Sequence, residues 1–227
     1  MAEFFAALAL FLLSHAIPSR PALRQRLAAT LGERTYQLLY SILSLALLVW
    51  LISAAARAPY VPLWDLTIGQ YWVPIAVMLP AFILFAGGAI VPNPLSINFS
   101  RRRFDPERAG IVTVTRHPVL WGFALWAFAH VVPNGDLVSL IMFGGFGLFA
   151  LAGMALVDRR KKRQLGADWG LLARRTSVIA FAPSPERRLP WDWRSLAVAV
   201  VVGALLYVAL LHLHPLLFGP DPKAAFG

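Results

Sequence analysis

The 227-residue sequence has no cysteine and few charged residues. The absence of cysteine excludes disulfide bonds, thiolate zinc sites, iron–sulfur clusters and cysteine nucleophiles. Charged residues make up 14% of the chain, whereas an ordinary globular domain has about 25%. Hydrophobic residues reach 59% and the mean hydropathy is +0.65, so the composition excludes an ordinary soluble domain. Any metal site must therefore use histidine, methionine, tyrosine or carboxylate ligands.

Long apolar stretches account for this composition. A bilayer core of about 30 Å requires about 20 apolar residues in a helix, and six stretches approach that length. They cover residues 2–17, 37–56, 71–91, 118–133, 137–157 and 195–213. No Lys or Arg precedes the first stretch, so we interpret it as a membrane span and not as a secretory signal. The sequence predicts an all-α protein, a polytopic membrane helical bundle with about six transmembrane helices that forms a single domain over residues 1–227.

Positive charges are distributed asymmetrically between these stretches. Of the 21 Lys and Arg residues, all but Arg57 and Lys223 lie in the segments after the first, third and fifth stretches. The positive-inside rule then predicts that these three segments face the cytoplasm and that both termini lie outside it. The net charge of +10 therefore indicates membrane topology and contact with anionic lipid headgroups, and it does not indicate nucleic-acid binding.

Small and polar residues inside the apolar stretches suggest how the helices pack. The second stretch and its start carry polar side chains at helical spacing: Tyr36, Gln37, Tyr40, Ser41 and Ser44. We interpret them as partners for hydrogen bonds between helices, with the lining of a site as the alternative. Glycines in the fifth stretch predict close helix packing there: Gly144, Gly145, Gly147 and Gly153.

Two histidines, His15 and His130, are embedded in the first and fourth apolar stretches. A neutral imidazole is costly to bury without a partner, so each needs a hydrogen bond or a metal. Their helices run in opposite directions, and their depths in the bilayer differ by up to about 10 Å, which suits a large cofactor better than a bare ion. Two imidazoles without a thiolate or a nearby carboxylate favour haem iron over zinc. A structural histidine with a hydrogen-bond partner is the alternative at each position.

His117 lies between Arg116 and Pro118, at the predicted cytoplasmic start of the fourth stretch. Proline is favoured as the first residue of a helix. His117 is about 20 Å along this helix from His130, too far for both to ligate one small ion. For Arg116 two roles are open, an anchor at the level of the lipid headgroups or a partner for a haem propionate, so Arg116 and His117 are candidate cofactor contacts. Two further histidines are expected at the outer interface: His212 and His214.

Several motifs resemble the NnrU family. They are residues 11–20, 32–36 with Tyr40-Ser41, 115–118 continuing through Trp126 to His130, 158–161 and 174–181. The resemblance is strongest over residues 1–183. The family includes the plant 15-cis-zeta-carotene isomerase, a membrane enzyme that holds haem b, and the resemblance implies that His15 and His130 ligate a haem b. In the isomerase a cysteine implicated in ligand exchange lies three residues before the second histidine, and this position is Ala127 here.

The resemblance implies more than one function. Bacterial members are associated with denitrification, because nitrite and nitric oxide reductase function depends on them. The plant member implies, as an alternative, a haem-dependent cis–trans isomerase that acts on a carotenoid-like polyene. The Arg116-His117-Pro118 element is also similar to membrane methyltransferases that bind S-adenosylmethionine, although Asp158-Arg159 stands where they have a Glu-Glu pair. A non-catalytic alternative is an assembly protein whose basic loops bind a partner. We expect an integral protein of the bacterial inner membrane whose partners are lipid, haem and either a polyene or nitric oxide.

Overall fold

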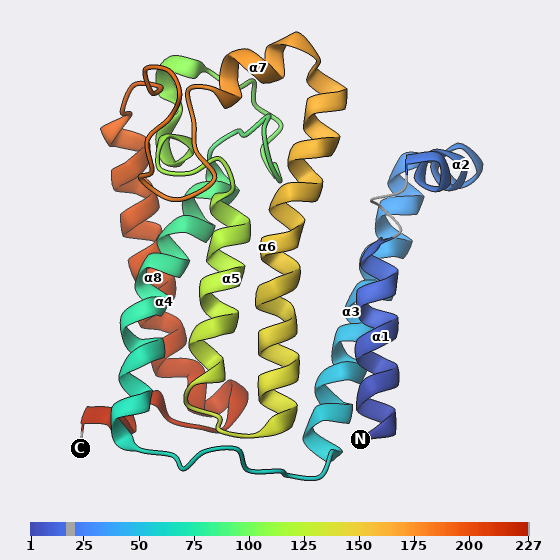
Figure 1. Cartoon of the computed structure of the whole chain (residues 1–227), viewed down its shortest axis with the longest axis vertical. Coiled ribbons are helices and arrows are strands. Elements are labelled where there is room, and N and C mark those ends of the chain that lie inside the picture. The colour runs from blue at the N-terminus through green and yellow to red at the C-terminus, as the bar shows by residue number, and fades with distance from the viewer. Residues whose placement is uncertain (17–20, 227) are drawn as a thin grey trace. The chain divides into compact units, whose positions relative to one another are not determined.

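The computed structural model describes residues 1–16 and 21–226, and within these residues the fold is helical (Figure 1). The helices are α1 (Ala2–Ala16), α2 (Pro21–Leu31), α3 (Glu33–Arg57), α4 (Ile68–Ile90), α5 (Pro118–Val131), α6 (Leu137–Leu165), α7 (Ala167–Ala173) and α8 (Trp193–Phe218). The end of the first predicted stretch, Ile17, and the basic Arg20 lie outside the described residues. The prediction of an all-α fold is confirmed.

The long helices correspond to the predicted membrane spans. Four of them, α3, α4, α6 and α8, are long and apolar enough to cross a membrane, and α1 and α5 are shorter apolar helices. Large apolar side chains on α8, such as Val201 and Leu205, are exposed, which is the arrangement expected where lipid surrounds a helix. The chain is therefore an integral membrane protein. α6 continues past the predicted end of its span, residue 157, to Leu165, because the charged residues beyond the apolar stretch are compatible with helix outside the hydrocarbon.

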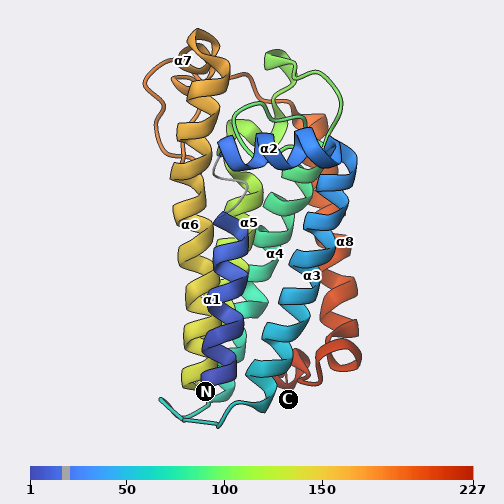
Figure 2. The same ribbon diagram turned by 90° about the vertical axis from the view of Figure 1, so that its right-hand side faces the viewer.

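Contacts divide the chain into two compact units, Met1–Leu63 with Asp136–Met142, and Trp64–Gly135 with Phe143–Gly227. In the first unit α1 packs along α3, and α2 runs across the end of α3 (Figure 2). Glu3 of α1 accepts hydrogen bonds from Trp50 Nε1 at 3.1 Å and from Arg57 Nη2 at 2.5 Å, both on α3. These contacts fix the register of the two helices at their shared end.

In the second unit α4 packs against both α5 and α8, and glycines permit the close approach. A Cβ atom on Gly203 of α8 would lie 2.6 Å from Ile83 Cα of α4, and one on Gly122 of α5 would lie 2.9 Å from the Ala81 carbonyl oxygen. The predicted glycines of α6 are used differently. A Cβ on Gly147 would meet the ring of Phe128, and one on Gly145 would have no atom within 4 Å. The closest backbone approaches are thus on α4, α5 and α8.

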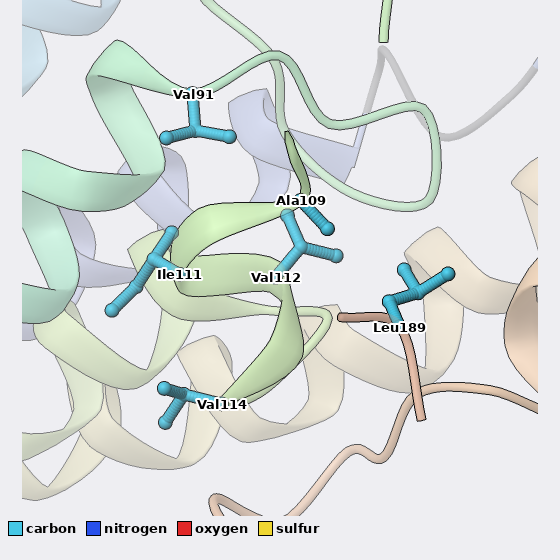
Figure 3. Packing of buried hydrophobic residues seen from close by; sticks show 6 residues of the cluster. All are labelled: Val91, Ala109, Ile111, Val112, Val114 and Leu189. Atoms are coloured by element: carbon cyan, nitrogen blue, oxygen red, sulfur yellow. The ribbon is translucent and has the colours of Figure 1, made fainter. Parts of the chain in front are cut away.

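The long connection between α4 and α5 folds into a compact cap. It contains two 3₁₀ turns, η2 (Pro106–Arg108) and η3 (Gly110–Thr113), and a cluster of buried apolar side chains (Figure 3). Five members of the cluster come from this connection and the sixth, Leu189, comes from the segment before α8: Val91, Ala109, Ile111, Val112, Val114 and Leu189. Arg188 donates hydrogen bonds to the carbonyl oxygens of Thr113 and Ala182, which joins the segment before α8 to this connection. The cap holds the residues just before α5 in fixed positions.

The α4–α8 contact is tested by replacing Gly203 with alanine. The added methyl group collides with the backbone at Ile83, and we expect Gly203→Ala to lower the free energy of unfolding by about 1–3 kcal/mol. The measurement is the midpoint of thermal unfolding in detergent. Gly145→Ala is the matched control, because it has space and improves helix propensity by about 1 kcal/mol. Equal midpoints for the two variants would contradict the packing described.

Candidate functional site

A partly buried ion pair joins the start of α5 to α6. Arg116 Nε lies 3.2 and 3.1 Å from the two carboxylate oxygens of Asp158, and Arg116 Nη2 lies 2.6 Å from Oδ2. The Arg116 and Asp158 side chains are only 15% and 19% exposed. The guanidinium also lies over the ring of Trp169 on α7, 5.6 Å from its centroid. Charge-assisted contacts of this kind are strong and directional, so Arg116 has a defined position.

His117 completes this network from the α5 side. Its side chain is fully buried, with Nδ1 2.8 Å from Ser96 Oγ and Nε2 2.8 Å from Asp158 Oδ1. The order Ser–His–Asp resembles a hydrolase triad, but the ring is reversed, since in a triad Nε2 faces the serine and Nδ1 the carboxylate. Ser96 is also buried, and its hydroxyl is paired with His117. The network therefore ties the connection after α4, the start of α5 and α6 together.

His130 lies in the last turn of α5 among aromatic rings. Its Nδ1 is 2.7 Å from the Trp126 carbonyl oxygen, and the centroid of its ring is 5.4 Å from that of Phe143. The ring of His214 from α8 lies 6.5 Å away at an interplanar angle of 17°. The sequence contains no signal for this proximity, because His130 and His214 are on different helices and far apart along the chain.

His15 lies in the first unit, between α1 and α3. Its Nδ1 is 2.8 Å from the Phe11 carbonyl oxygen, and its ring faces the edge of Tyr40 with 6.0 Å between centroids. Tyr36 stacks near Tyr40, and among the described residues the buried hydroxyl of Tyr36 has no hydrogen-bond partner. Of the polar residues predicted on α3, Tyr40 therefore lies near His15. The Ser41 hydroxyl instead donates a hydrogen bond to a backbone carbonyl oxygen of α3 itself.

The chemistry of these two histidines fits residues that would hold a haem iron. A ligating histidine usually donates one ring N–H to a carbonyl or carboxylate, which leaves the other nitrogen as the ligand. Both His15 and His130 direct Nδ1 to the carbonyl oxygen four residues earlier, which fixes Nε2 as the nitrogen with the lone pair. The exposed His212 makes the same contact with Val208, so the contact permits ligation without being specific to it.

The predicted site residues are thus placed in three groups. Arg116 and His117 meet at Asp158, His130 lies at the other end of α5, and His15 belongs to the first unit. The pairing of His15 with His130 and the propionate role of Arg116 stay predictions. Within residues 1–16 and 21–226, no group of three or more His, Asp or Glu side chains has the arrangement to hold a bare metal ion. Asp158 was not predicted as a partner of Arg116 and His117, because its place directly before a basic run does not identify residues so distant in the chain as its partners.

An apolar hollow of about 220 Å³ lies among α4, α5 and α8. Large side chains contribute most of its lining: Met78, Phe82, Phe85, Phe123, Trp126 and Leu210. Trp126 is also the residue whose carbonyl oxygen contacts His130, so the hollow begins one helical turn from that imidazole.

Removing the shared carboxylate tests the network. Asp158→Ala leaves the partly buried Arg116 guanidinium and the buried His117 ring without their acceptor, and we expect a loss of about 2 kcal/mol in the free energy of unfolding. Thermal unfolding in detergent measures the loss. Glu186→Ala, which removes an exposed pair with Arg174, serves as the control and should cost less than about 1 kcal/mol. A similar small effect for both variants would refute a structural role for the network.

Comparison with known proteins assigns the chain to a family. A family model described as NnrU protein matches residues 3–222 and so includes most of both compact units. The chain is 29% identical over 199 residues to the 15-cis-zeta-carotene isomerase, chloroplastic, of Arabidopsis thaliana, covering 83% of this chain and 53% of that protein. The protein of the same name from Zea mays is 26% identical over 206 residues, 86% of this chain and 56% of that protein.

This chain therefore spans about half the length of the curated relatives it matches. No solved structure matches it. Since the family model covers almost the entire sequence, the chain belongs to the NnrU family.

Proposed function

We propose that this protein binds one haem b within the membrane and that His15 and His130 would hold it. The observation that carries the proposal is that both imidazoles lie in apolar helices with Nδ1 engaged by a backbone carbonyl, so that Nε2 has the lone pair for iron. Bound haem would supply an iron centre for electron transfer, for binding of nitric oxide or for chemistry on a polyene.

The protein's own residues would orient the imidazoles and exclude water. The Trp126 and Phe143 rings pack around His130, and the Phe11 and Tyr40 rings pack around His15. Aromatic surroundings lower the local dielectric and disfavour water at a metal centre. The Tyr36 hydroxyl near Tyr40, which has no hydrogen-bond partner within residues 1–16 and 21–226, would serve as a hydrogen-bond donor to a bound group.

The side chain at position 127 limits the chemistry available at such a centre. Ala127 is fully buried in α5, and the chain has no cysteine. A thiolate from this protein therefore cannot exchange with an imidazole, and the proposed ligand set consists of histidines alone. This composition favours a haem that transfers electrons or senses nitric oxide over one that switches to a thiolate ligand.

Membership of the NnrU family supports a role in denitrification, in which the protein would assist nitrite and nitric oxide reductase function. We propose that it lies in the cytoplasmic membrane of a bacterium. Its basic segments would face the cytoplasm, because 19 of its 21 Lys and Arg residues lie in those segments. Both termini would then lie on the opposite side.

A second candidate function is cis–trans isomerisation of a polyene. Two observations favour it: the names of the relatives from Arabidopsis thaliana and Zea mays, and the apolar hollow next to His130. With about 220 Å³ the hollow accommodates a section of a conjugated chain, while the remainder of such a molecule would lie in the lipid. Phe85, Phe123 and Trp126 provide the flat contacts that a polyene needs.

The haem proposal is tested by the visible absorption spectrum of the purified protein. We expect a Soret band after expression with adequate haem, and we expect the His15→Ala, His130→Ala double variant to lose it. His212→Ala is the matched control, because His212 has the same Nδ1 contact but lies exposed on α8, and it should keep the band. A wild-type protein without a Soret band, or a double variant that retains it, would contradict the proposal.

The isomerase candidate is tested by incubating the reduced, haem-loaded protein with 15-cis-zeta-carotene and following the isomers by chromatography. If the polyene occupies the hollow, Leu210→Phe should fill part of it and slow conversion about tenfold or more. Leu205→Phe on the exposed face of the same helix should leave the rate unchanged. No conversion by the wild-type protein counts against this function, and equal rates for the two variants count against the hollow as the binding site.

A further inference from the structure

A second cavity, of about 540 Å³, opens where α6 meets α7. Its charged lining residues are all cationic: Arg116, Lys162 and Arg174. Trp169, Thr176 and Ser177 complete the polar part of the lining. A cavity with three cations and no anion among its described lining residues attracts an anionic group.

The three cations are available to different degrees. Arg116 directs Nε and Nη2 to Asp158, and its Nη1 donors remain for another acceptor. Arg174 lies 3.4 Å from Glu186 in a largely exposed pair, which is weak in water. Lys162 has no acidic partner among the described residues. A bound anion would therefore gain contacts without first breaking a strong ion pair.

Three residues that lie close in the sequence to lining residues have exposed apolar side chains. Leu171 is 66% exposed, Ile179 is 63% exposed and Phe181 is 69% exposed. Phe181 has a positive φ of 60°, which is rare for an aromatic residue, and its backbone N–H donates to the Val114 carbonyl oxygen at 3.0 Å. The backbone therefore holds Phe181 where its aromatic ring is exposed. Contact of this ring with water is unfavourable, whereas contact with a lipid surface is favourable.

The cavity also lies at the level of the membrane boundary. Arg116 is two residues before the first residue of the apolar helix α5, and Lys162 follows the end of the apolar part of α6. Phosphate groups of lipids lie at this level, with acyl chains on one side and the cytoplasm on the other.

We propose that this cavity binds the phosphate group of an anionic phospholipid, with Lys162, Arg174 and Arg116 as its cationic contacts and with Leu171, Ile179 and Phe181 in the adjoining acyl region. A free phosphate ion would use the same cations, but it would gain nothing from the exposed apolar side chains. The lipid headgroup is therefore the occupant that both features favour. This site is independent of haem binding and can be tested without it.

The experiment is native mass spectrometry of the full chain in detergent, titrated with short-chain phosphatidylglycerol and, in parallel, phosphatidylcholine. We expect the wild-type protein to prefer phosphatidylglycerol. The Lys162→Gln, Arg174→Gln variant should bind it about 10- to 30-fold more weakly, since each basic residue near an anionic headgroup contributes a factor of about five. The control, Arg103→Gln with Arg187→Gln, removes the same charge from exposed positions outside the cavity and should change the affinity less than about twofold.

Three results would overturn the proposal. The first is an equal loss of affinity for phosphatidylglycerol in the control variant, which would mean that the basic segments attract lipid only through their overall charge. The second is calorimetric binding of inorganic phosphate as tight as that of phosphatidylglycerol, which would identify a soluble anion as the ligand. The third is binding of S-adenosylmethionine that excludes phosphatidylglycerol and is weakened by Lys162→Gln, Arg174→Gln, which would assign the cavity to a nucleoside cofactor. Retained thermal stability in both variants ensures that the comparison reports binding.

Discussion

The hydrocarbon of a bilayer offers no hydrogen bonds, and most features of this protein depend on that constraint. Its long elements are helices because only a helix satisfies every backbone group within one segment. The same constraint accounts for the side chains of His15 and His130, which bond to carbonyl oxygens of their own helices. It also accounts for the glycines on α4, α5 and α8: water does not drive these helices together, so close backbone contact must supply the attraction.

At the ends of the membrane helices, outside the hydrocarbon, charged side chains can form ion pairs. Asp158 lies one residue past the apolar part of α6 and serves both Arg116 and His117, so that a single carboxylate connects α6 to the start of α5. The cap built from the α4–α5 connection and the segment around Arg188 holds these residues from outside. The proposed lipid site lies directly beside this rigid network, whereas the proposed haem ligand His130 lies at the opposite end of α5.

The lack of cysteine separates this chain from the chemistry associated with the plant enzyme of its family. Ala127 is fully buried, so its methyl group belongs to the packing of α5 and provides no ligand. A haem held by both imidazoles would be suited to electron transfer or to sensing by ligand exchange, and the apolar hollow beside Trp126 adds a place for a hydrophobic substrate. The two proposed functions therefore use the same imidazole and differ in whether the hollow is occupied.

The sequence by itself determined the helical fold, the approximate limits of the membrane helices and the importance of the histidines, because hydropathy and helical spacing are local properties. The apolar pattern gave the membrane span of α6 up to residue 157, and the structure adds that the helix continues through the charged residues to Leu165. The sequence offered no means of pairing Asp158 with Arg116 or His214 with His130. Only the tertiary structure decided these pairs, since they join residues that are distant in the chain and depend on how each helix is rotated about its axis.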